Sequence, residues 1–403
     1  MQDNEKKPAL RFKGFTDPWE QRKLGEVFEE YSEKNHAELP PLTIIQGGGT
    51  IRRDESERAL QYDKSSLSNY KMVNKDDFIV HLRSFEGGLE KASSQGIISP
   101  AYHTFHGEDV DSRFYYAYFR SKNFINKDLK PHVYGIRDGR SIDIEGMKTI
   151  RIPWASYPEQ KSIGDFLTHL DTLITLHQRK YEKLVNIKKS MLDKMFPKNG
   201  ASVPEIRFKG FTDLWEQRKL EEYLEVSGQK NFEGIYTKED VLSVSGDFGI
   251  VNQIEFQGRS FAGASVANYG VVETGDIVYT KSPLKSNPYG IIKANKGKNG
   301  IVSTLYAVYK PKQSANPEFV QNYFEQDARM NNYMHPLVNK GAKNDMKVSA
   351  ENALKGQIVF PDIKEQRTIS EFFRNLDTLI TLHQRKLEKL QNIKKSCLEK
   401  MFV

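Results

Sequence analysis

Cysteine is nearly absent from this sequence, since Cys397 is the one cysteine among 403 residues. An intrachain disulfide is therefore excluded, as is a zinc site made of several cysteine ligands, and a reducing, cytoplasmic setting is expected. The sequence also lacks any run of about 18 apolar residues, so no transmembrane helix is predicted. The first ten residues are polar and do not contain the apolar segment of a secretory signal.

The signatures of a cofactor-binding enzyme are missing as well. No G-x-x-x-x-G-K-[ST] phosphate loop occurs, and no G-x-G-x-x-G motif lies between a predicted strand and a predicted helix. Asn287-Pro288-Tyr289 is similar to part of the catalytic loop of adenine methyltransferases, but it lacks the second proline of that loop. Pro361-Asp362 could open a nuclease motif, but no [DE]-x-K follows at a suitable distance. We therefore expect this chain to hold no catalytic residue, no metal and no cofactor.

The charge of the chain is mildly basic and evenly spread. Sixty basic and 53 acidic residues give a net charge of +7, of which +3 lies up to Gly200 and +4 beyond it. No basic tail stands out. This balance permits a polyanionic partner but does not require one.

An internal duplication is the most informative feature that is present. Residues 11–24 (RFKGFTDPWEQRKL) recur as residues 207–220, with 13 of 14 positions identical. Residues 170–196 recur as residues 376–402, with 23 of 27 positions identical. The bodies between these blocks, about 25–150 and 221–355, show no comparable match. A unit of about 200 residues is a duplicated domain rather than a solenoid repeat, so one frame carries two different bodies.

The closing blocks have the pattern of long amphipathic helices. Apolar residues recur at alternating steps of three and four, which is typical of a coiled-coil seam. Ser156 and Asp362 are each followed three residues later by a glutamate, which predicts a capping box at each helix start. The predicted seam residues are Leu170, Leu173, His177, Tyr181, Leu184, Ile187, Met191, Leu376, Leu379, His383, Leu387, Leu390, Ile393 and Cys397.

A single helix of about 30 residues, roughly 45 Å long, must bury such a seam against a partner. The simplest partner is its own copy in the other half of the chain. An antiparallel pair would relate the two bodies by an approximate two-fold axis, although the sequence leaves a parallel pair open.

Several polar residues of these helices allow two interpretations. His177 and His383 lie in the seam, where a shared metal site competes with the more common hydrogen-bonded histidine. Cys397 takes the place of a methionine in the repeat, which favours packing over a reactive thiol. Lys188-Lys189 and Lys394-Lys395 lie off the seam. A solvated face and a surface for phosphates or an acidic partner are both open for these lysines.

The bodies predict a mixed α+β fold with short strands. In the first body, residues 78–82, 96–99 and 150–153 are strand-like, and residues 112–122 are helical. In the second body, the strand-like segments are 241–244, 276–280, 290–293, 305–309 and 357–361. Residues 317–326 of that body predict a helix with Asn316 as its cap.

Basic residues alternate with aromatic and amide side chains in glycine-rich loops of both bodies. Arginine and lysine can neutralise phosphates or bind guanine, and asparagine can pair with adenine. Each loop alone is more often a solvated turn, but basic loops at corresponding places favour a binding face. The candidates are Arg52, Arg53, Arg83, Ser84, Tyr102, Tyr134, Arg137 and Arg140 in the first body, and Lys281, Lys285, Asn287, Tyr289, Asn339, Lys340, Lys343 and Asn344 in the second.

Taken together, these segments resemble the specificity subunits of type I restriction–modification systems, and the resemblance covers essentially the whole chain. It rests on Trp19–Gly25 with its copy Trp215–Leu220, and on the run Ile152-Pro153, Glu159-Gln160, Leu170-Asp171 and Ile174 with its copy Phe360-Pro361, Glu365-Gln366, Leu376-Asp377 and Ile380. Within the bodies, Asp77–Val80 and Gly275–Val278 resemble the G-D-I strand of the family's recognition domains, and Ile98–Tyr102 resembles the following loop.

Two positions depart from the family pattern. Asp76 stands where the family usually has a glycine, and Trp154-Ala155-Ser156 replaces a turn that is more often rich in proline. Neither departure changes the architecture that the resemblance implies.

The resemblance implies a DNA reader that is not itself an enzyme. Target-recognition domains would span 1–155 and 199–361, and two conserved helices at 156–198 and 362–403 would form an antiparallel coiled coil with pseudo-two-fold symmetry. Each domain would read one half of a bipartite, asymmetric DNA target, with half-sites about one DNA turn, or roughly 34 Å, apart.

The resemblance also implies partners. Double-stranded DNA would be bound together with two modification subunits, which carry S-adenosylmethionine and methylate adenine. Two restriction subunits, driven by ATP with Mg, are optional further partners. Two other functions stay open on the residues alone: a free-standing DNA adenine methyltransferase, against which the missing motifs argue, and a coiled-coil scaffold without a DNA role.

Overall fold

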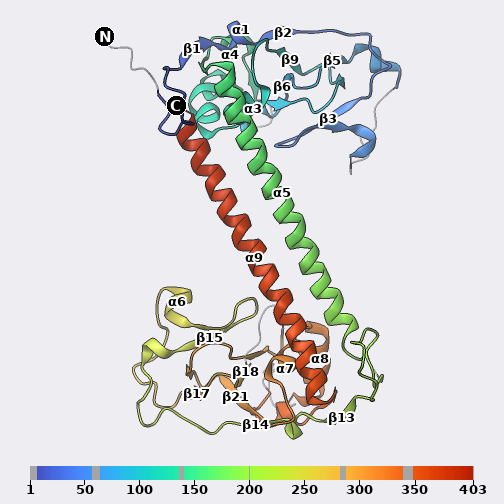
Figure 1. The fold of residues 1–403 in the computed structure, drawn as a ribbon, viewed down its shortest axis with the longest axis vertical. Coiled ribbons are helices and arrows are strands. Elements are labelled where there is room, and N and C mark those ends of the chain that lie inside the picture. Colours follow the sequence, from blue (N-terminus) through green and yellow to red (C-terminus); the bar gives the residue numbers. More distant parts are fainter. Residues whose placement is uncertain are drawn as a thin grey trace. The chain divides into compact units, whose positions relative to one another are not determined.

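The computed structural model describes residues 7–56, 64–135, 140–198, 200–281, 287–338 and 348–402. The chain divides into two units: unit 1 joins Met1–Arg179 to Gln384–Val403, and unit 2 is Lys180–His383. Each unit is a mixed α+β body packed on segments of two long helices, α5 (Tyr157–Lys194) and α9 (Ile363–Met401) (Figure 1). The predicted mixed fold class is therefore confirmed. In the described part of the chain, none of the helices could span a bilayer.

The first body, in unit 1, is built on a four-stranded antiparallel sheet. Its strand order is β2 (Glu29–Tyr31), β9 (His103–His106), β6 (Phe78–Val80) and β7 (Glu90–Lys91). Three strand pairs accompany the sheet: β3 (Leu42–Ile45) with β4 (Gly49–Arg52), β5 (Lys71–Val73) with β8 (Gly96–Ile98), and β10 (Val133–Tyr134) with β11 (Ser141–Ile142). The helices are α1 (Leu24–Val27), α2 (Ser84–Gly87), α3 (Ser112–Phe119) and α4 (Ile144–Lys148), with short helices η1 (Arg53–Glu55), η2 (Lys64–Asn69), η3 (Phe124–Leu129) and η4 (Lys130–His132).

The second body, in unit 2, repeats this plan. Its four-stranded sheet has the order β14 (Leu224–Val226), β21 (Tyr306–Pro311), β18 (Ile277–Thr280) and β19 (Ile292–Ala294). The accompanying pairs are β15 (Leu242–Ser245) with β16 (Gly249–Asn252), and β17 (Gly270–Val272) with β20 (Gly300–Val302). The helices are α6 (Gln253–Gln257), α7 (Pro317–Tyr323) and α8 (Asp327–Met334), with short helices η6 (Leu220–Glu222), η7 (Lys238–Asp240), η8 (His335–Leu337) and η9 (Asn352–Leu354).

The duplication thus extends into the bodies, where the two sequences do not match. In the first sheet Phe78 is paired with Phe105, and in the second Ile277 is paired with Tyr309. Each of the strands and helices predicted from the sequence overlaps an observed one, and α7 is capped by Asn316 as predicted. The strands that were not predicted, such as β14, are short or half-exposed segments with little apolar alternation.

The repeated ends of each half are hydrogen-bonded to each other. Strand β1 (Glu20–Lys23) pairs with β12 (Arg151–Trp154), and β13 (Glu216–Lys219) pairs with β22 (Gln357–Phe360). The start and the end of each body therefore meet at the strand that leads into a long helix. The opening strand has the same sequence (EQRK) in both halves, whereas its partners β12 (RIPW) and β22 (QIVF) share only the isoleucine.

The start of each long helix is a polar anchor rather than a complete capping box. Asp362 caps α9, since its Oδ1 accepts from the backbone N–H groups of Lys364 (2.7 Å) and Glu365 (2.9 Å). The glutamates, however, do not reach back to the cap. Glu159 accepts two hydrogen bonds from Arg11, at 2.8 and 2.7 Å, and Glu365 accepts two from Arg207, both at 2.7 Å.

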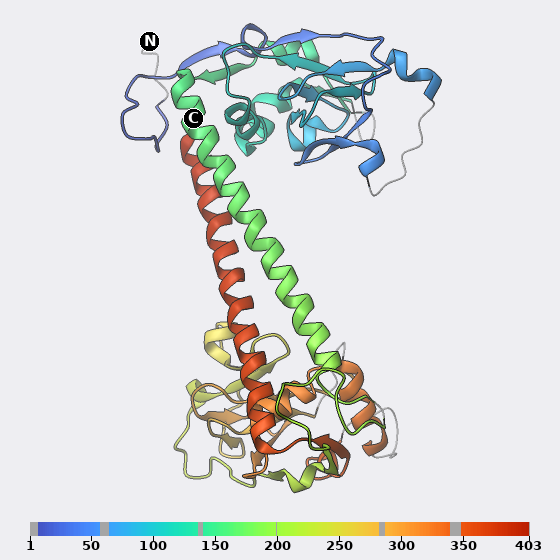
Figure 2. The same ribbon diagram turned by 45° about the vertical axis from the view of Figure 1, so that its right-hand side comes forward.

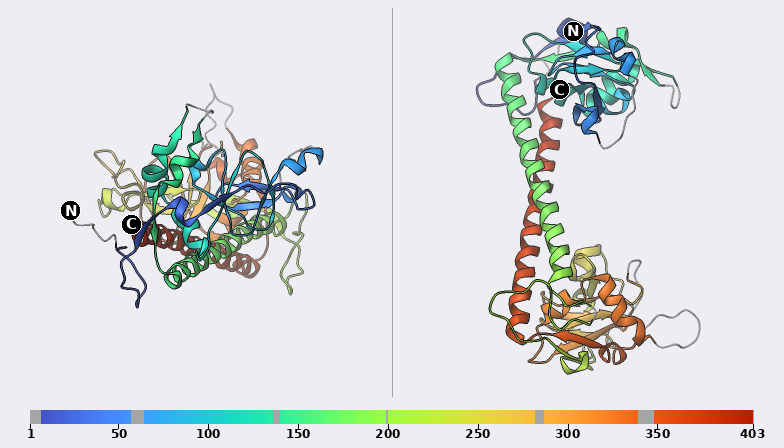
Figure 3. Two further views of the ribbon diagram at one scale, coloured as in Figure 1. Left: turned by 90° about the horizontal axis from the view of Figure 1, so that it is seen from above. Right: turned by 90° about the vertical axis from the view of Figure 1, so that its right-hand side faces the viewer.

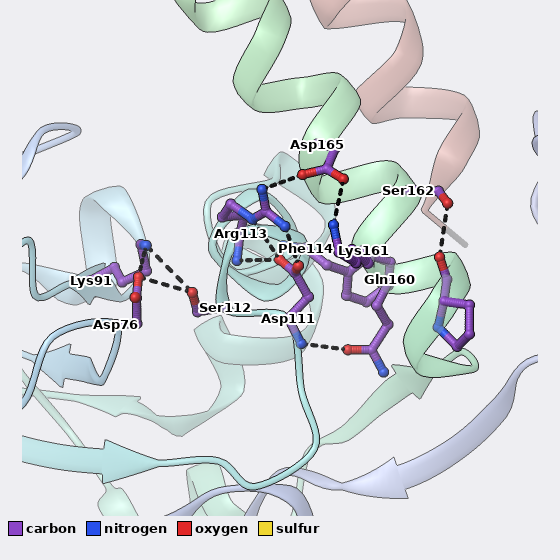
Figure 4. A network of polar contacts seen from close by, with 11 residues as sticks. Asp76, Lys91, Asp111, Ser112, Arg113, Phe114, Gln160, Lys161, Ser162 and Asp165 are labelled. Atoms are coloured by element: carbon purple, nitrogen blue, oxygen red, sulfur yellow. Dashed lines mark hydrogen bonds and ion pairs between the residues drawn. The ribbon is translucent and has the colours of Figure 1, made fainter.

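The glutamine after each glutamate ties the long helix to its body. In unit 1 the side chain of Gln160 accepts from the backbone N–H of Asp111, the residue that caps α3 (Figure 4). In unit 2 Gln366 accepts from the backbone N–H of Asn316, the residue that caps α7. The Glu-Gln pair therefore fixes the opening segment and the body's helix to the same turn of the long helix.

The long helices run antiparallel in both units, as predicted (Figures 2 and 3). In unit 1 Lys394, near the end of α9, forms an ion pair with Asp171, near the start of α5. In unit 2 Lys188, near the end of α5, forms the equivalent pair with Asp377, near the start of α9. These two lysines are thus interhelical contacts, unlike the solvated or phosphate-binding lysines that the sequence suggested. The predicted two-fold relation between the halves stays a prediction.

The predicted seam is buried mainly where a helix meets a body. Leu170, Leu376 and Cys397 are buried, whereas Leu379 and Ile393 are 43% and 37% exposed. The remaining predicted seam residues, Leu173, His177, Tyr181, Leu184, Ile187, Met191, His383, Leu387 and Leu390, are half-buried. Among the residues that the structure describes, no group of three His, Cys, Asp or Glu side chains could hold a metal.

The core of each body is completed by the residues at the end of a long helix, α9 for the first body and α5 for the second. In unit 1 Phe402 packs on Trp19 and Phe114, with ring centroids 6.5 and 5.1 Å apart. In unit 2 Phe196 packs on Trp215 and Phe319, at 6.3 and 5.5 Å. Because 196 and 402 are the same position of the repeat, the two bodies use the same docking contact.

Candidate nucleic-acid interface

Three segments meet at one edge of the first body. They are the tip of the β3–β4 hairpin (46–48), the β6–β7 loop (81–89), and Arg140 before β11. Gln46 lies against Gly87, since a Cβ built on Gly87 would meet the Gln46 amide nitrogen at 2.5 Å. The Arg140 guanidinium lies 5.0 Å from the centre of the Phe85 ring. The structure therefore brings the predicted candidates Arg83 and Arg140 to one edge, beside the tip of the β3–β4 hairpin.

The glycines of the β3–β4 hairpin give this tip its shape. Gly47 and Gly49 have φ angles of +85° and +75°, which only glycine adopts without strain. A Cβ on Gly49 would also approach the backbone oxygen of Lys91 at 2.7 Å. The glycine cluster is therefore a tight hairpin turn packed on the body.

Arginines surround these loops and change the titration of His81. Arg83 and Arg140 are exposed, and the side chain of Arg120, at the end of α3, is 26% exposed. Burial, followed by the charges of Arg120 and Arg83, lowers the pKa of His81 to about 4. The imidazole is thus neutral at pH 7, and its buried Nε2 atom has no hydrogen-bond partner among the described residues. The cationic character of this edge therefore comes from the arginines.

The other candidates of the first body are spread more widely. Arg52 is exposed and pairs with Asp54, while Arg53 is half-buried and lies 5.2 Å from the Tyr70 ring centre, at the end of β4 away from the tip. Tyr102 is half-buried beside His81, with ring centroids 6.1 Å apart. Ser84 is fully buried, and its hydroxyl accepts from the backbone N–H of His81. Tyr134 is 59% exposed on β10.

In the second body, three candidates lie around the loop that follows β18. Lys281 donates to the backbone oxygen of Thr304 at 2.9 Å, and burial, followed by the charge of Lys230, lowers its pKa. Asn287 is buried, and Tyr289 is half-buried against His335. The remaining candidates, which are Arg137, Lys285, Asn339, Lys340, Lys343 and Asn344, lie outside the described residues.

Sequence reasoning missed several residues that shape this edge. The backbone N–H of Gly47, in the hairpin tip, donates to Glu90, and Glu90 is in turn contacted by Tyr116 and Arg120. The Arg140 guanidinium packs on the ring of Phe85. No motif marks them, because their contacts depend on strand register and on the end of α3. The one available signal is the nine-residue spacing from the cap Asp111 to Arg120, which recurs from Asn316 to Glu325.

The departure from the G-D-I pattern is accommodated in the backbone. Asp76 adopts φ +73°, and Gly275, at the same place before β18, adopts φ +95°. Aspartate tolerates this left-handed region better than most residues. The next residues, Asp77 and Asp276, are both buried and both accept a backbone N–H from the preceding turn, from Asn74 and Glu273. The two turns are therefore equivalent despite the substitution.

Comparisons with known proteins agree with this architecture. Residues 16–186 match the family model of the type I restriction modification DNA specificity domain. The chain is 22% identical to the MjaX type I restriction enzyme specificity subunit of Methanocaldococcus jannaschii, over 94% of this chain and 91% of that protein. It is also 22% identical to the MjaVIII specificity subunit of the same organism, over 80% of this chain and 77% of that protein.

A solved structure has the same fold. The crystal structure of the type I restriction–modification S subunit from M. genitalium covers 99% of this chain and 99% of its own, with a TM-score of 0.59 and 15% sequence identity. The chain is thus similar to the specificity subunits of type I restriction–modification systems along most of its length.

Proposed function

We propose that each body reads one half of a bipartite DNA target, and that the chain thereby directs adenine methylation and restriction by partner subunits. The observation that carries this proposal is the repeated body. The same strand order occurs twice on nearly identical frames, while the loops at the edge of the sheet differ. A repeated fold with different loops is what the reading of two different base sequences requires.

The edge of the first body has the chemistry that a duplex needs. Exposed Arg83 and Arg140 can neutralise phosphates or bind guanine in the major groove. Lys281 and Tyr289 flank the corresponding loop of the second body. The other predicted candidates, including those outside the described residues, are proposed as contacts of the two half-sites, except Ser84 and Asn287, whose side chains are buried.

The long helices offer equivalent surfaces for partners. Leu176 in unit 1 and Leu382 in unit 2 are the same position of the repeat, and each is 44% exposed. Apolar residues exposed at equivalent places suit two copies of one protein. We therefore propose that one modification subunit docks on the helices of each unit, with S-adenosylmethionine bound by that subunit and ATP and Mg by restriction subunits where these join.

Exchange of one body tests the proposal. Residues 25–150 are replaced by the corresponding body of another family member, and the chain is expressed with its modification subunits. Methylome sequencing before and after the exchange should show a new sequence in one half of the target and the original sequence in the other. The reciprocal exchange of 221–355 is the matched control and should change the opposite half. A change in both halves, or in neither, contradicts the proposal.

A further inference from the structure

A buried charged residue occupies the same place in both sheets, but with opposite sign. In the first body Glu90 of β7 is paired with Ile79 of β6, and in the second body Lys293 of β19 is paired with Val278 of β18. Ile79 and Val278 each lie two residues after the buried aspartate of the preceding turn. Glu90 is fully buried and Lys293 is 6% exposed. The two positions are therefore structurally equivalent and charge-reversed.

The ion-pair partners are reversed as well. Glu90 pairs with Arg120, and Lys293 pairs with Glu325 at 2.9 Å. Arg120 and Glu325 both follow the cap of their helix by nine residues. Each body thus keeps one buried ion pair between its edge strand and the end of its helix, with the two signs exchanged.

In the first body the buried carboxylate also holds the hairpin tip. Glu90 accepts hydrogen bonds from the backbone N–H groups of Gly47 (2.7 Å) and Gly49 (3.1 Å), and from the Tyr116 hydroxyl (2.8 Å). A carboxylate can accept all these bonds because both of its oxygens carry lone pairs. The shape of the tip and the place of Arg120 beside it therefore depend on one side chain.

In the second body the corresponding pair is directed elsewhere. Glu325, the partner of Lys293, also lies 3.7 Å from Lys188 of α5, so this pair joins the body to the long helix. Lys293 cannot hold a hairpin tip as Glu90 does, because an ammonium group has no acceptor for backbone N–H groups. The surroundings of Gly249 in the β15–β16 hairpin are also open, since no described atom lies within 4 Å of a Cβ built there. Equivalent positions thus perform two different tasks: one fixes a loop, and the other fixes a helix.

We infer that Glu90 is a positioning residue for target recognition, which fixes the 46–48 tip and Arg120 for the half-site read by the first body. Lys293 has no such role in the second body. The inference rests on the proposed function, because it assumes that the tip lies at the DNA. Glu90 itself, being fully buried, acts through the loop and not by contact with a base.

The test compares Glu90→Gln with Lys293→Gln in the full chain assembled with its modification subunits. Gln has the shape of Glu, but it is uncharged and has one accepting oxygen. It therefore cannot accept hydrogen bonds from the N–H groups of both glycines and also neutralise the charge of Arg120. For each variant, Kd is measured for the cognate duplex and for duplexes with one base pair changed in either half-site. We expect Glu90→Gln to reduce discrimination about tenfold in one half-site, which corresponds to the loss of about one charged hydrogen bond. Discrimination in the other half-site should stay within about twofold.

Lys293→Gln is the matched control, since it removes an equally buried ion pair that does not touch a hairpin. It should leave discrimination unchanged in both half-sites, whatever it does to stability. Tyr116→Phe, which removes one hydrogen bond to Glu90 and keeps the ring, provides a milder variant if Glu90→Gln does not fold. Tyr116→Phe should reduce discrimination in the same half-site as Glu90→Gln, by a smaller factor.

The outcomes separate this inference from the proposed function. If the wild-type complex discriminates in both half-sites but Glu90→Gln and Tyr116→Phe change neither, or both equally, the positioning role is wrong. The same holds if Lys293→Gln produces the one-sided loss. If the wild-type complex does not discriminate between the duplexes at all, the proposed function itself fails.

Discussion

At the scale of single residues, the Arg–Glu anchors show why two distant blocks of sequence are repeated together. Arg11 belongs to the opening block and Glu159 to the helix start, and the same contact recurs between Arg207 and Glu365. Glu159 also accepts from the Trp19 indole at 2.9 Å. The carboxylate is buried, and in the described part of the chain its side-chain partners come from the opening block, so a change in either segment would leave a charge unpaired.

Replacement of Arg11 by Ala should destabilise unit 1 by about 3 kcal/mol, because it leaves the Glu159 carboxylate buried without its cation. Hydrogen exchange of β1, β12 and the first turns of α5 should become faster. Arg207→Ala is the matched variant and should have the same effect on β13, β22 and the start of α9 only. Unchanged protection of β1 and β12 in Arg11→Ala would show that the anchor does not hold the body together.

His81 predicts a pH dependence of stability. In the unfolded chain its pKa is about 6.5, and in the folded chain it is about 4. Between these values the unfolded state binds more protons, so the free energy of unfolding decreases as the pH falls from 7 to 4. Denaturant unfolding at several pH values measures the free energy of unfolding. Its decrease between pH 7 and pH 4 should be smaller in His81→Phe than in the wild type, by on the order of 2 kcal/mol. Parallel pH profiles for the two proteins would contradict the depressed pKa.

Some of these side-chain roles could be predicted from the sequence and others could not. The caps Asp362 and Asn316 were predictable, because a cap depends on residues two or three positions away. Glu159 and Glu90 were not, because their partners lie 148 and 30 residues away and meet them only through the fold. The capping-box prediction for Glu159 and Glu365 was wrong for this reason: each buried glutamate pairs with a half-buried arginine instead of its own helix start.

At the scale of elements, heptad spacing predicted the long helices well but their burial less well. Helix α5 starts one residue after the predicted cap Ser156, and α9 one residue after Asp362. Leu379 and Ile393 nonetheless stay exposed, because two helices alone cover only part of an apolar stripe. The short strands of the bodies were harder to predict, since three or four residues carry little periodic signal.

Replacement of Leu184 or Leu390 by Asp should disrupt assembly with the modification subunits. Both leucines are half-buried and pack against the core of their unit, where a charge is costly to bury. Lys389→Asp, an exposed change of charge next to Leu390, is the control and should assemble normally. Size-exclusion chromatography of the coexpressed subunits measures the result, and an intact complex with Leu390→Asp would count against the prediction.

At the scale of the whole molecule, the repeated docking contacts predict that the bodies are interchangeable. The second body rests on Met195 and Phe196, and the first on Met401 and Phe402, which are the same positions of the repeat. A chain in which residues 25–150 also replace 221–355 should therefore fold and assemble. Its methylome should show a target whose two halves are the same sequence in opposite orientation; two unlike halves would refute interchangeability.

The contact of Phe402 with Trp19 has a consequence for biosynthesis. Residues 397, 401 and 402 belong to the core of the first body but follow the entire second body in the chain. The second body, by contrast, has Leu192, Met195 and Phe196 already in place before its own first strand is made. During translation the first body therefore cannot complete its core until the last residues of the chain have been made. The second body can finish folding before the first.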